Sequence, residues 1–331
     1  MRIAVDAMGG DNAPQQIIEG VIQALPEIGE DQIVLVGDKS VIKSQLDSQF
    51  PSWQDRISVV HASEVVDMND SPVDALRRKK DSSIAVMTKL VACGDAEIVL
   101  SAGNTGAFVA ASQMSMRLLP GVSRPGILVA FPTVKGPIVL IDVGSNVSPK
   151  AIHFYEYALM ADVYCREMFG DQNPSIGLIN IGEEEAKGTS LLKTVNKLLR
   201  DDKSLNFVGN IEPRELLDRP AEILVCDGFI GNIVLKLTEG VSASLFKYIA
   251  KEFAEQKPEL LPHFKPVVEK IYAKHDYVEY GGAPLLGVNG HTFICHGRSD
   301  ARAIKNAILV ALKHAKSGIN DKIVERLKAA R

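Results

Sequence analysis

Short apolar runs that alternate with helical patterns constrain the fold of this chain more than any other feature of its sequence. Many of the runs are unbroken stretches of Ile, Val and Leu, as expected of strands that are buried on both faces. The alternation is typical of a largely parallel sheet covered by helices, so we predict an α/β fold. The length favours one unit with two lobes over residues 1–331. The expected strands are RIAVDA, QIVLVG, RISVV, AEIVLSA, GILVAFP, PIVLIDV, SIGLINI, LNFVG, AEILVCD and HTFICH.

Capping residues mark the expected starts of two helices. Ser71 can cap a helix that has Pro72 at its first position and Asp74 close to the place of a capping-box acid. Ser299 can cap the last long helix. The apolar face expected for that helix consists of Ile304, Ala307, Ile308, Ala311 and Leu312.

One segment departs from the alternation of strands and helices. Residues 232–257 have the pattern of one long helix, and Pro258, Pro262 and Pro266 then interrupt a stretch of apolar residues. Because prolines break helices into short pieces, we expect residues 232–277 to form a protruding helical segment rather than another strand and helix.

The composition argues against several classes of protein. A net charge of -4 does not suit a general nucleic-acid-binding protein, which needs concentrated Lys and Arg. The four cysteines are far apart and lack the paired spacing of a zinc site or a redox motif. The first residues lack the apolar core of a signal peptide, and no apolar run approaches the roughly 18 residues that span a bilayer. We therefore expect a cytoplasmic protein with reduced thiols.

Polar turns, most of them with glycine, follow six of the expected strands. In an open α/β sheet, ligands bind beyond the carboxyl ends of the strands, where loops meet helix N-termini. We therefore expect the six turns to converge on one edge of the sheet and to form an active site there. The turns are DAMGGDNAP, SAGNTGA, DVGSN, NIGEEEAKGT, CDGFIGN and CHGRSD.

The turn SAGNTGA is the clearest candidate for an anion-binding site. Asn104 can cap the following helix, and Gly103 and Gly106 let the backbone approach a ligand. The N–H groups from Thr105 onward would then point outward. For this turn, and for the similar CDGFIGN, a glycine-assisted bend without a ligand remains the alternative.

The turn NIGEEEAKGT only approximates a phosphate-binding P-loop. In a P-loop the lysine follows the second glycine, whereas here Lys187 precedes Gly188 and Thr189. Three glutamates, residues 183–185, would also repel a polyphosphate. We therefore reject a P-loop, although Lys187 and Thr189 before a helix suit one small anion. The chain also has no G-x-G for a dinucleotide and no G-x-S-x-G nucleophile elbow.

Three other polar features have open interpretations. Cys295 adjoins His296, but neighbours on a strand point to opposite faces, so we expect a structural cysteine rather than a nucleophile with its base. Arg298 follows a strand end and can bind an oxyanion or form a surface salt bridge. The basic run RRKK, residues 77–80, is either a solvated surface or a docking site for an acidic protein.

Together these motifs closely resemble the PlsX family, the acyl-carrier-protein:phosphate acyltransferases of bacterial phospholipid synthesis. The resemblance runs in order from Met1 to the last helix and is weakest over residues 250–277. The motifs that carry it are MRIAVDAMGGDNAP, RRKKDSS, SAGNTGA, RPG, DVGSN, NIGEEEAKGT, GNIEPREL, CDGFIGN, YGGAPLLGVNG and HGRS.

The resemblance implies an enzyme that moves a long fatty acyl group from the thioester of acyl carrier protein to inorganic phosphate. The product would be an acyl phosphate, which a membrane glycerol-3-phosphate acyltransferase would use. The implied fold is a three-layer α/β/α arrangement similar to those of phosphotransacetylases and isopropylmalate-type dehydrogenases. The resemblance also implies a homodimer that needs no metal or organic cofactor.

This chemistry gives the polar residues expected roles. The expected catalytic group is Lys187, Asp227, Asn232 and Arg298. The expected phosphate-binding group is Ser101, Gly103, Asn104, Thr105, Gly106 and Thr189. The expected docking surface for acyl carrier protein, which is acidic, is Arg77, Arg78, Lys79 and Lys80. An amphipathic tip that rests on the membrane, or packs within the dimer instead, is expected at Leu260, Leu261, Phe264, Val267 and Val268.

Two other functions compete with acyl transfer. A metal-dependent, NAD-linked dehydrogenase on a similar fold would need clustered aspartates, and the candidates are Asp6, Asp11, Asp142 and Asp227. A non-catalytic scaffold for acyl carrier protein or a membrane would not need the polar side chains of the glycine-bearing turns.

Overall fold

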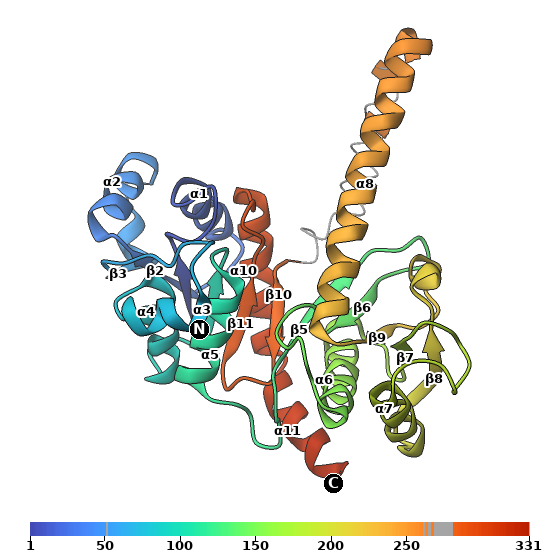
Figure 1. Ribbon diagram of the computed structural model, residues 1–331. Coiled ribbons are helices and arrows are strands. Elements are labelled where there is room, and N and C mark those ends of the chain that lie inside the picture. The colour runs from blue at the N-terminus through green and yellow to red at the C-terminus, as the bar shows by residue number, and fades with distance from the viewer. Residues whose placement is uncertain (51, 261, 264–265, 268–280, 331) are drawn as a thin grey trace.

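In the described part of the chain, one sheet of eleven strands has helices on both of its faces (Figure 1). The computed structural model describes residues 1–50, 52–260, 262–263, 266–267 and 281–330. The strand order is β3-β2-β1-β4-β11-β10-β5-β6-β9-β7-β8. The strands are β1 Arg2–Asp6, β2 Gln32–Gly37, β3 Ile57–His61, β4 Ile98–Ser101, β5 Gly126–Phe131, β6 Ile138–Ile141, β7 Ser175–Ile179, β8 Asn206–Ile211, β9 Ile223–Val225, β10 Ala283–Leu286 and β11 His291–Ile294.

Alternate side chains of the strands pack under helices on opposite faces, which gives the predicted three layers. In β1, Ile3 and Val5 are buried in one hydrophobic cluster, and Ala4 between them is buried in another. This two-sided burial explains why the strands are unbroken apolar runs. The helices are α1 Gln15–Ala24, α2 Lys39–Gln49, α3 Pro72–Arg78, α4 Ser83–Ala92, α5 Thr105–Met116, α6 Ala151–Phe169, α7 Ser190–Asp201, α8 Gly228–Gln256, α10 Ala301–Lys316 and α11 Ile319–Ala329.

The sheet consists of two parallel halves that an antiparallel centre joins. Strands β3, β2, β1, β4 and β11 are parallel to one another, and so are β6, β9, β7 and β8. Between these halves, β10 is antiparallel to β11 and to β5, and β5 is antiparallel to β6. The two halves therefore run in opposite directions. The prediction that all six turns share one edge of the sheet is wrong, because the carboxyl ends of the two halves leave the sheet at opposite edges.

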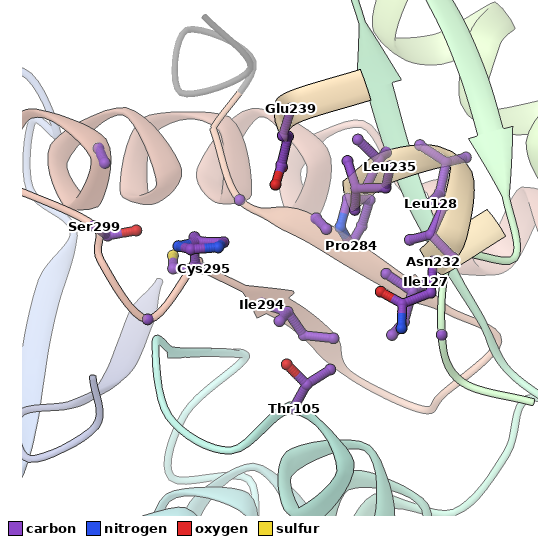
Figure 2. A pocket seen from close by; sticks show the side chains of 18 of the residues that line it. Thr105, Ile127, Leu128, Asn232, Leu235, Glu239, Pro284, Ile294, Cys295 and Ser299 are labelled. Carbon is purple, nitrogen blue, oxygen red and sulfur yellow. The ribbon is translucent and has the colours of Figure 1, made fainter. Parts of the chain in front are cut away.

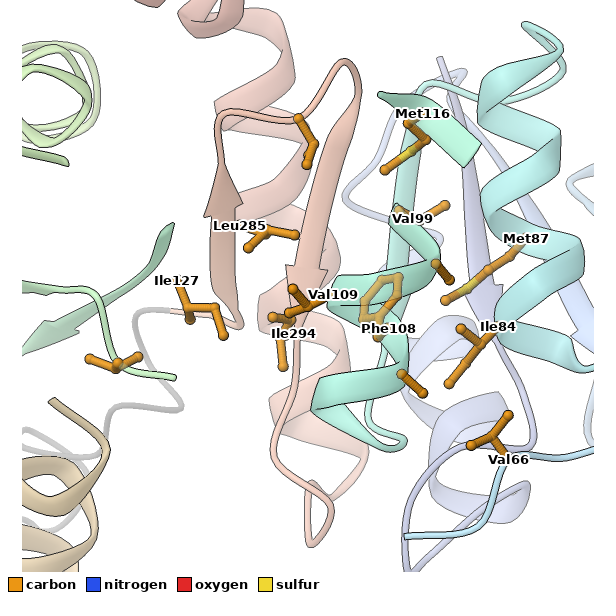
Figure 3. Close-up of a cluster of buried hydrophobic side chains, with 14 of the residues drawn as sticks. Val66, Ile84, Met87, Val99, Phe108, Val109, Met116, Ile127, Leu285 and Ile294 are labelled. Carbon is orange, nitrogen blue, oxygen red and sulfur yellow. The ribbon is translucent and has the colours of Figure 1, made fainter. Parts of the chain in front are cut away.

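All ten predicted strands are present, and β10 is the strand that the sequence did not predict. Its four residues contain Pro284 and follow Gly281 and Gly282, a composition that favours a loop. Pairing on both sides with β11 and β5 stabilises it nonetheless. Beneath this centre, Leu285 and Ile294 lie in one buried cluster with Phe108 of α5 (Figure 3).

Helix α10 begins one residue later than the sequence predicted. Its N-cap is Asp300, whose carboxylate accepts a hydrogen bond from Ala303 N at 2.9 Å, so the prediction of Ser299 is wrong. At α3, Ser71 is the N-cap and Pro72 follows it, as predicted, but the Ser71 hydroxyl donates to the Asp74 carboxylate instead of accepting from the backbone. The predicted apolar face of α10 is confirmed, since all five of its residues are buried.

The long helix α8 projects well beyond the rest of the molecule (Figure 1). The protruding segment over residues 232–277 as a whole stays a prediction, because part of that range lies outside the described residues. A short helical turn over Pro258–Leu260 follows it. An exposed apolar stripe consisting of Ile233, Leu237, Val241, Leu245 and Tyr248 runs along α8.

Helix α8 is long and apolar enough to cross a membrane, judged by length and composition alone. The sequence did not predict a helix of this kind. An 18-residue window of it has a mean hydropathy of 1.2 and at most two charged side chains. Core helices of soluble proteins and signal sequences can be equally long and apolar. The first turns of α8 instead contribute Asn232, Lys236 and Glu239 to the site described below.

Candidate active site

A cavity of about 410 Å³ lies where the two halves of the sheet meet. Strands β5 and β10, the N-terminal parts of α5 and α8 and the loop after β11 line it (Figure 2). Apolar side chains such as Ile127 and Leu235 form part of the wall, and polar groups converge beside them. An apolar cavity with a few converging polar groups is typical of a small-molecule site. Five of the six predicted turns contribute to its lining, through Asp11, Thr105 with Gly106, Gly144, Asn232 and Arg298.

The N-terminus of α5 lies at the cavity. Asn104 caps this helix, as predicted, by accepting a hydrogen bond from Ala107 N at 3.0 Å. Thr105 and Gly106, the first residues of the helix, line the cavity. Their amides are among those that a helix leaves without internal partners, and the helix dipole favours an anion there. This terminus is therefore suited to a phosphate or carboxylate.

The side chain of Asn104 is used by the protein itself. Its amide nitrogen donates to the carbonyl oxygens of Asp67, Met68 and Asp70 at 3.1, 3.2 and 3.1 Å. These contacts fix the loop over residues 67–70, and Met68 of that loop lines the cavity. The contribution of Asn104 to the site is therefore to shape the cavity wall and to start α5.

Ser101 and Gly103 lie beneath the same turn. The Ser101 hydroxyl donates to the buried Asp6 carboxylate at 2.7 Å and accepts from Gly103 N at 3.0 Å. Burial raises the pKa of Asp6 above its usual range. The backbone packs closely here, since a side chain at Gly9 would overlap the Asp6 carboxylate and Gly103 N. The buried pair of Asp6 and Ser101 thus joins the turn after β1 to the turn after β4.

A second buried carboxylate organises the opposite wall. Asp142, at the end of β6, accepts hydrogen bonds from the backbone N–H groups of Gly144, Ser145 and Asn146 at 2.7–3.0 Å. Burial is the largest influence on its pKa, which is raised. This network shapes the turn DVGSN, from which Gly144 reaches the cavity.

Helix α8 begins against this turn. Asp227 caps α8 by accepting from Phe229 N at 3.0 Å and from Ile230 N at 2.9 Å. Asp227 is not among the residues that line the cavity, whereas Asn232, one turn further along the helix, is. Of these two predicted catalytic residues, the structure therefore places Asn232 at the cavity and Asp227 in a capping position.

The loop after β11 forms a third wall of the cavity. It contributes Cys295, His296 and Arg298, and the backbone N–H of Arg298 donates to His296 Nδ1 at 3.2 Å. Burial raises the pKa of the Cys295 thiol to about 12, so the thiol stays protonated near neutral pH. Cys226 is likewise buried, with a raised pKa. These properties agree with the expectation of structural cysteines.

Lys187 and Thr189 lie outside the cavity lining. They belong to the loop between β7 and α7, where the Thr189 hydroxyl caps α7 by accepting from Leu192 N at 3.3 Å. The loop is held by the Asn180 side chain, which donates to the Lys187 carbonyl oxygen at 3.3 Å. The three glutamates of this turn line a separate depression with Arg200. The roles of Lys187 and Thr189 in binding phosphate remain predictions.

The predicted docking surface divides into two parts. Lys79 makes contacts within the protein. Its Nζ lies 2.7 Å from the Asp70 carboxylate and 3.1 Å from that of Asp67, and it donates to the Val65 carbonyl oxygen at 2.8 Å. Lys79 thus holds the same 67–70 loop as Asn104. The exposed cations of the cluster are Arg77, Arg78 and Lys80.

The sequence did not identify Lys236 and Glu239 as residues of the site. Both line the cavity from α8. A signal was present, because residues 232, 235, 236 and 239 have the spacing of one helix face. Asn232 was recognised only through its turn motif, and that motif ends before the second turn of the helix.

The predicted membrane tip is described only in part. Leu260 and Val267 are exposed, at 43% and 55%. Leu261, Phe264 and Val268 lie outside the described residues.

The fold places the chain in a class of proteins, the three-layer α/β/α proteins with a mostly parallel sheet. A phosphotransacetylase from Streptococcus pyogenes has a similar structure, with a TM-score of 0.67 over 96% of this chain and 94% of its own, at 15% sequence identity. The EutD phosphotransacetylase from Staphylococcus aureus is also similar, with a TM-score of 0.59 over 96% of this chain and 94% of its own, at 15% identity. At these identities the likeness concerns the fold.

Sequence relatives give a narrower assignment. The model of the fatty acid synthesis protein family matches residues 1–322. A phosphate acyltransferase from Geobacter sulfurreducens is 43% identical over 99% of this chain and 94% of its own length. One from Pelobacter propionicus is 44% identical over the same shares. The chain therefore belongs to this family, the PlsX family, and it is an acyltransferase.

Proposed function

We propose that the protein transfers a long-chain fatty acyl group from the thioester of acyl carrier protein to inorganic phosphate and releases an acyl phosphate for phospholipid synthesis. The observation that carries this proposal is that one cavity combines the free N-terminus of α5 with an apolar wall. An anion and an acyl thioester would meet there. The family assignment supports acyl transfer rather than the dehydrogenase alternative.

The phosphate would bind at the N-terminus of α5. Thr105, Gly106 and Arg298 line the same cavity. Backbone amides at a helix N-terminus and a guanidinium together suit a tetrahedral anion. Phosphate is a competent nucleophile near neutral pH, and a thiol with a pKa of about 8.5 is an undemanding leaving group. Such a site mainly has to hold phosphate against the thioester carbonyl.

The tetrahedral oxyanion would form between α5 and α8. Asn232 and Arg298 line the cavity from opposite elements, and both carry N–H donors suited to a developing negative charge. Asp227 would act indirectly, by capping the helix that presents Asn232. In this proposal Lys187 and Thr189 contribute from the loop after β7, either to phosphate binding or to an approach route.

Acyl carrier protein would dock on α3. Three cations, Arg77, Arg78 and Lys80, lie exposed at the C-terminal end of this helix and just after it. Its first residue is packed against the anion site, since a side chain at Gly106 would approach Pro72 to 2.6 Å. An acidic carrier that is attracted to α3 would therefore deliver its thioester beside the cavity.

The proposal includes a homodimer and a membrane surface. The exposed apolar stripe of α8 and the exposed Leu260 and Val267 provide contact area for a second subunit, for a bilayer, or for both. A cytoplasmic enzyme at the membrane surface would release its acyl phosphate close to a membrane glycerol-3-phosphate acyltransferase.

The experiment is to mix the purified protein with phosphate and each of three donors, without added metal, and to trap acyl phosphate with hydroxylamine. The donors are palmitoyl-acyl carrier protein, acetyl-acyl carrier protein and palmitoyl-coenzyme A. We expect hydroxamate chiefly from palmitoyl-acyl carrier protein. Equal rates with the acetyl donor would contradict the proposed chain length, and a preference for coenzyme A would contradict the proposed donor.

A further inference from the structure

Glu239 faces the cavity, yet the acyl transfer proposed above assigns it no task. It follows Asn232 by seven residues on α8, and Leu235 and Lys236 lie between them on the same cavity-lining face. Seven residues of α-helix place Glu239 about 10 Å further along the axis than Asn232. Figure 2 shows its side chain projecting from α8 toward the space beside the loop that carries Cys295.

The other charged or titratable groups around this part of the cavity are mainly cationic or hydrogen-bond donors. The lining includes Lys236 on the same helix, His296 and Arg298 on the loop after β11, and Asp11 on the loop after β1. Because the backbone N–H of Arg298 donates to His296 Nδ1, the neutral imidazole carries its proton on Nε2.

Apart from Asp11, which is exposed on the loop after β1, the other nearby carboxylates hold the scaffold. Asp6 bonds Ser101, Asp142 binds the turn after β6, and Asp227 caps α8. Burial raises the pKa of Glu239, and the neighbouring His296 and Lys236 oppose this only in part. A carboxyl group whose pKa lies nearer to neutrality is a better carrier of protons at neutral pH.

We propose that Glu239 is the proton-transfer residue of the acyl transfer, a role that rests on the function proposed above. As an oxygen of hydrogenphosphate bonds to the thioester carbon, the Glu239 carboxylate accepts the phosphate proton. The C–S bond then breaks, its electron pair goes to sulfur, and Glu239 returns the proton to that sulfur. The acyl phosphate and a neutral thiol leave, and Glu239 is again a carboxylate.

This relay predicts how activity depends on the leaving thiol. An alkyl thiolate is the more basic leaving group, so its departure gains most from the proton, whereas an aryl thiolate that bears a nitro group is a weak base and can leave without it. The test compares two donors in phosphate-dependent acyl transfer, palmitoyl-pantetheine and the palmitoyl thioester of 4-nitrothiophenol. The enzymes are the wild type, Glu239→Gln and the matched control Glu255→Gln, which changes an exposed glutamate near the far end of the same helix.

We expect Glu239→Gln to lose about 10²- to 10⁴-fold in kcat/KM with palmitoyl-pantetheine, the usual range for a general acid–base group. With the nitrothiophenol ester the loss should be much smaller, and Glu255→Gln should match the wild type with both donors. Glu239→Asp, which keeps a carboxyl group, should retain part of the activity. Equal losses with both donors, or full activity of Glu239→Gln, would overturn the proposal. A wild-type enzyme that transfers no acyl group to phosphate from either donor would instead contradict the proposed function itself.

Discussion

At the scale of single residues, most polar side chains around the cavity hold the protein's own backbone in place. Asp227 and Asn104 cap helices, and Asp142 binds three consecutive backbone amides. Among the polar residues that line the cavity, Arg298 and Glu239 are the ones to which we assign chemical roles. The buried carboxylates therefore determine the shape of the site, and a small set of side chains is left for chemistry.

Replacing Cys295 by alanine should leave acyl transfer nearly intact. The thiol lines the cavity, but burial raises its pKa to about 12, so almost none of it is the nucleophilic thiolate near pH 7. The measurement is kcat/KM for phosphate in Cys295→Ala, together with mass spectrometry of the wild type after exposure to acyl donor. A covalent acyl adduct on Cys295, or complete loss of activity in a folded variant, would contradict this view.

Two buried histidines should make the protein less stable in acid. The Nδ1 atoms of His291 and His314 lie 3.1 Å apart, and burial lowers the pKa of His291 to about 4 and that of His314 well below its usual value. Below a pH of about 6.5 the unfolded chain takes up protons that the folded protein does not, so stability falls as the pH drops from about 6.5 toward 4. The double variant His291→Gln, His314→Phe should show a shallower fall in Tm over this range.

The carboxylates that titrate in acid are the same in both proteins, so the difference between their Tm curves isolates the two histidines. Parallel curves for the variant and the wild type would show that the histidines contribute nothing to the acid sensitivity.

At the scale of elements, two neighbouring lysines after α3 should have different functions. Lys80 is exposed, so Lys80→Glu should raise the KM for acyl carrier protein several-fold at low salt, with less effect as salt screens the attraction. Lys79 holds the loop over residues 67–70, so Lys79→Met should lower the Tm and reduce kcat. The control is Lys43→Glu on α2, an exposed site that makes the same change of charge. An equal rise of KM in the control would rule out specific docking on α3.

A side chain at Gly231, near the start of α8, should destabilise the folded protein. A Cβ there would overlap the Asp142 carbonyl oxygen, which is backbone and cannot move aside. Gly231→Ala should therefore lower the free energy of unfolding by about 1–3 kcal/mol, the usual cost of overpacking. Gly240→Ala on the same helix meets no atom within 4 Å and should raise helix stability by about 0.5–1 kcal/mol. Urea unfolding measures both, and similar effects at the two positions would contradict the packing assigned to Gly231.

Some helices and strands could be predicted from local sequence, and others could not. Apolar runs and glycine-bearing turns predicted ten strands and the starts of several helices, because strand burial and helix capping are local properties. Strand β10 was missed because pairing on both sides, rather than its own composition, stabilises it. Glu239 was missed because its place in the site depends on which face of α8 is turned to the cavity.

At the scale of the whole molecule, the site exists because two parallel half-sheets meet through an antiparallel centre. The hairpin of β5 and β6 reverses the direction of the sheet, and the first turns of α8 then line the same cavity as the N-terminus of α5. No local pattern in the sequence indicates this reversal, so the sequence predicted that all six turns lie at one edge of the sheet. The structure instead gathers five turns around a central cavity and leaves the turn with Lys187 outside its lining.

The central claim is that phosphate attacks an acyl thioester in this cavity. The most direct measurement follows thiol release from palmitoyl-acyl carrier protein as phosphate is varied, and counts acyl phosphate as hydroxamate in the same samples. We predict that thiol and hydroxamate appear in equal amounts, that both rates saturate with phosphate, and that Arg298→Ala raises the phosphate concentration needed for half the maximal rate. Thiol release that is independent of phosphate, or that yields free fatty acid without hydroxamate, would contradict the account.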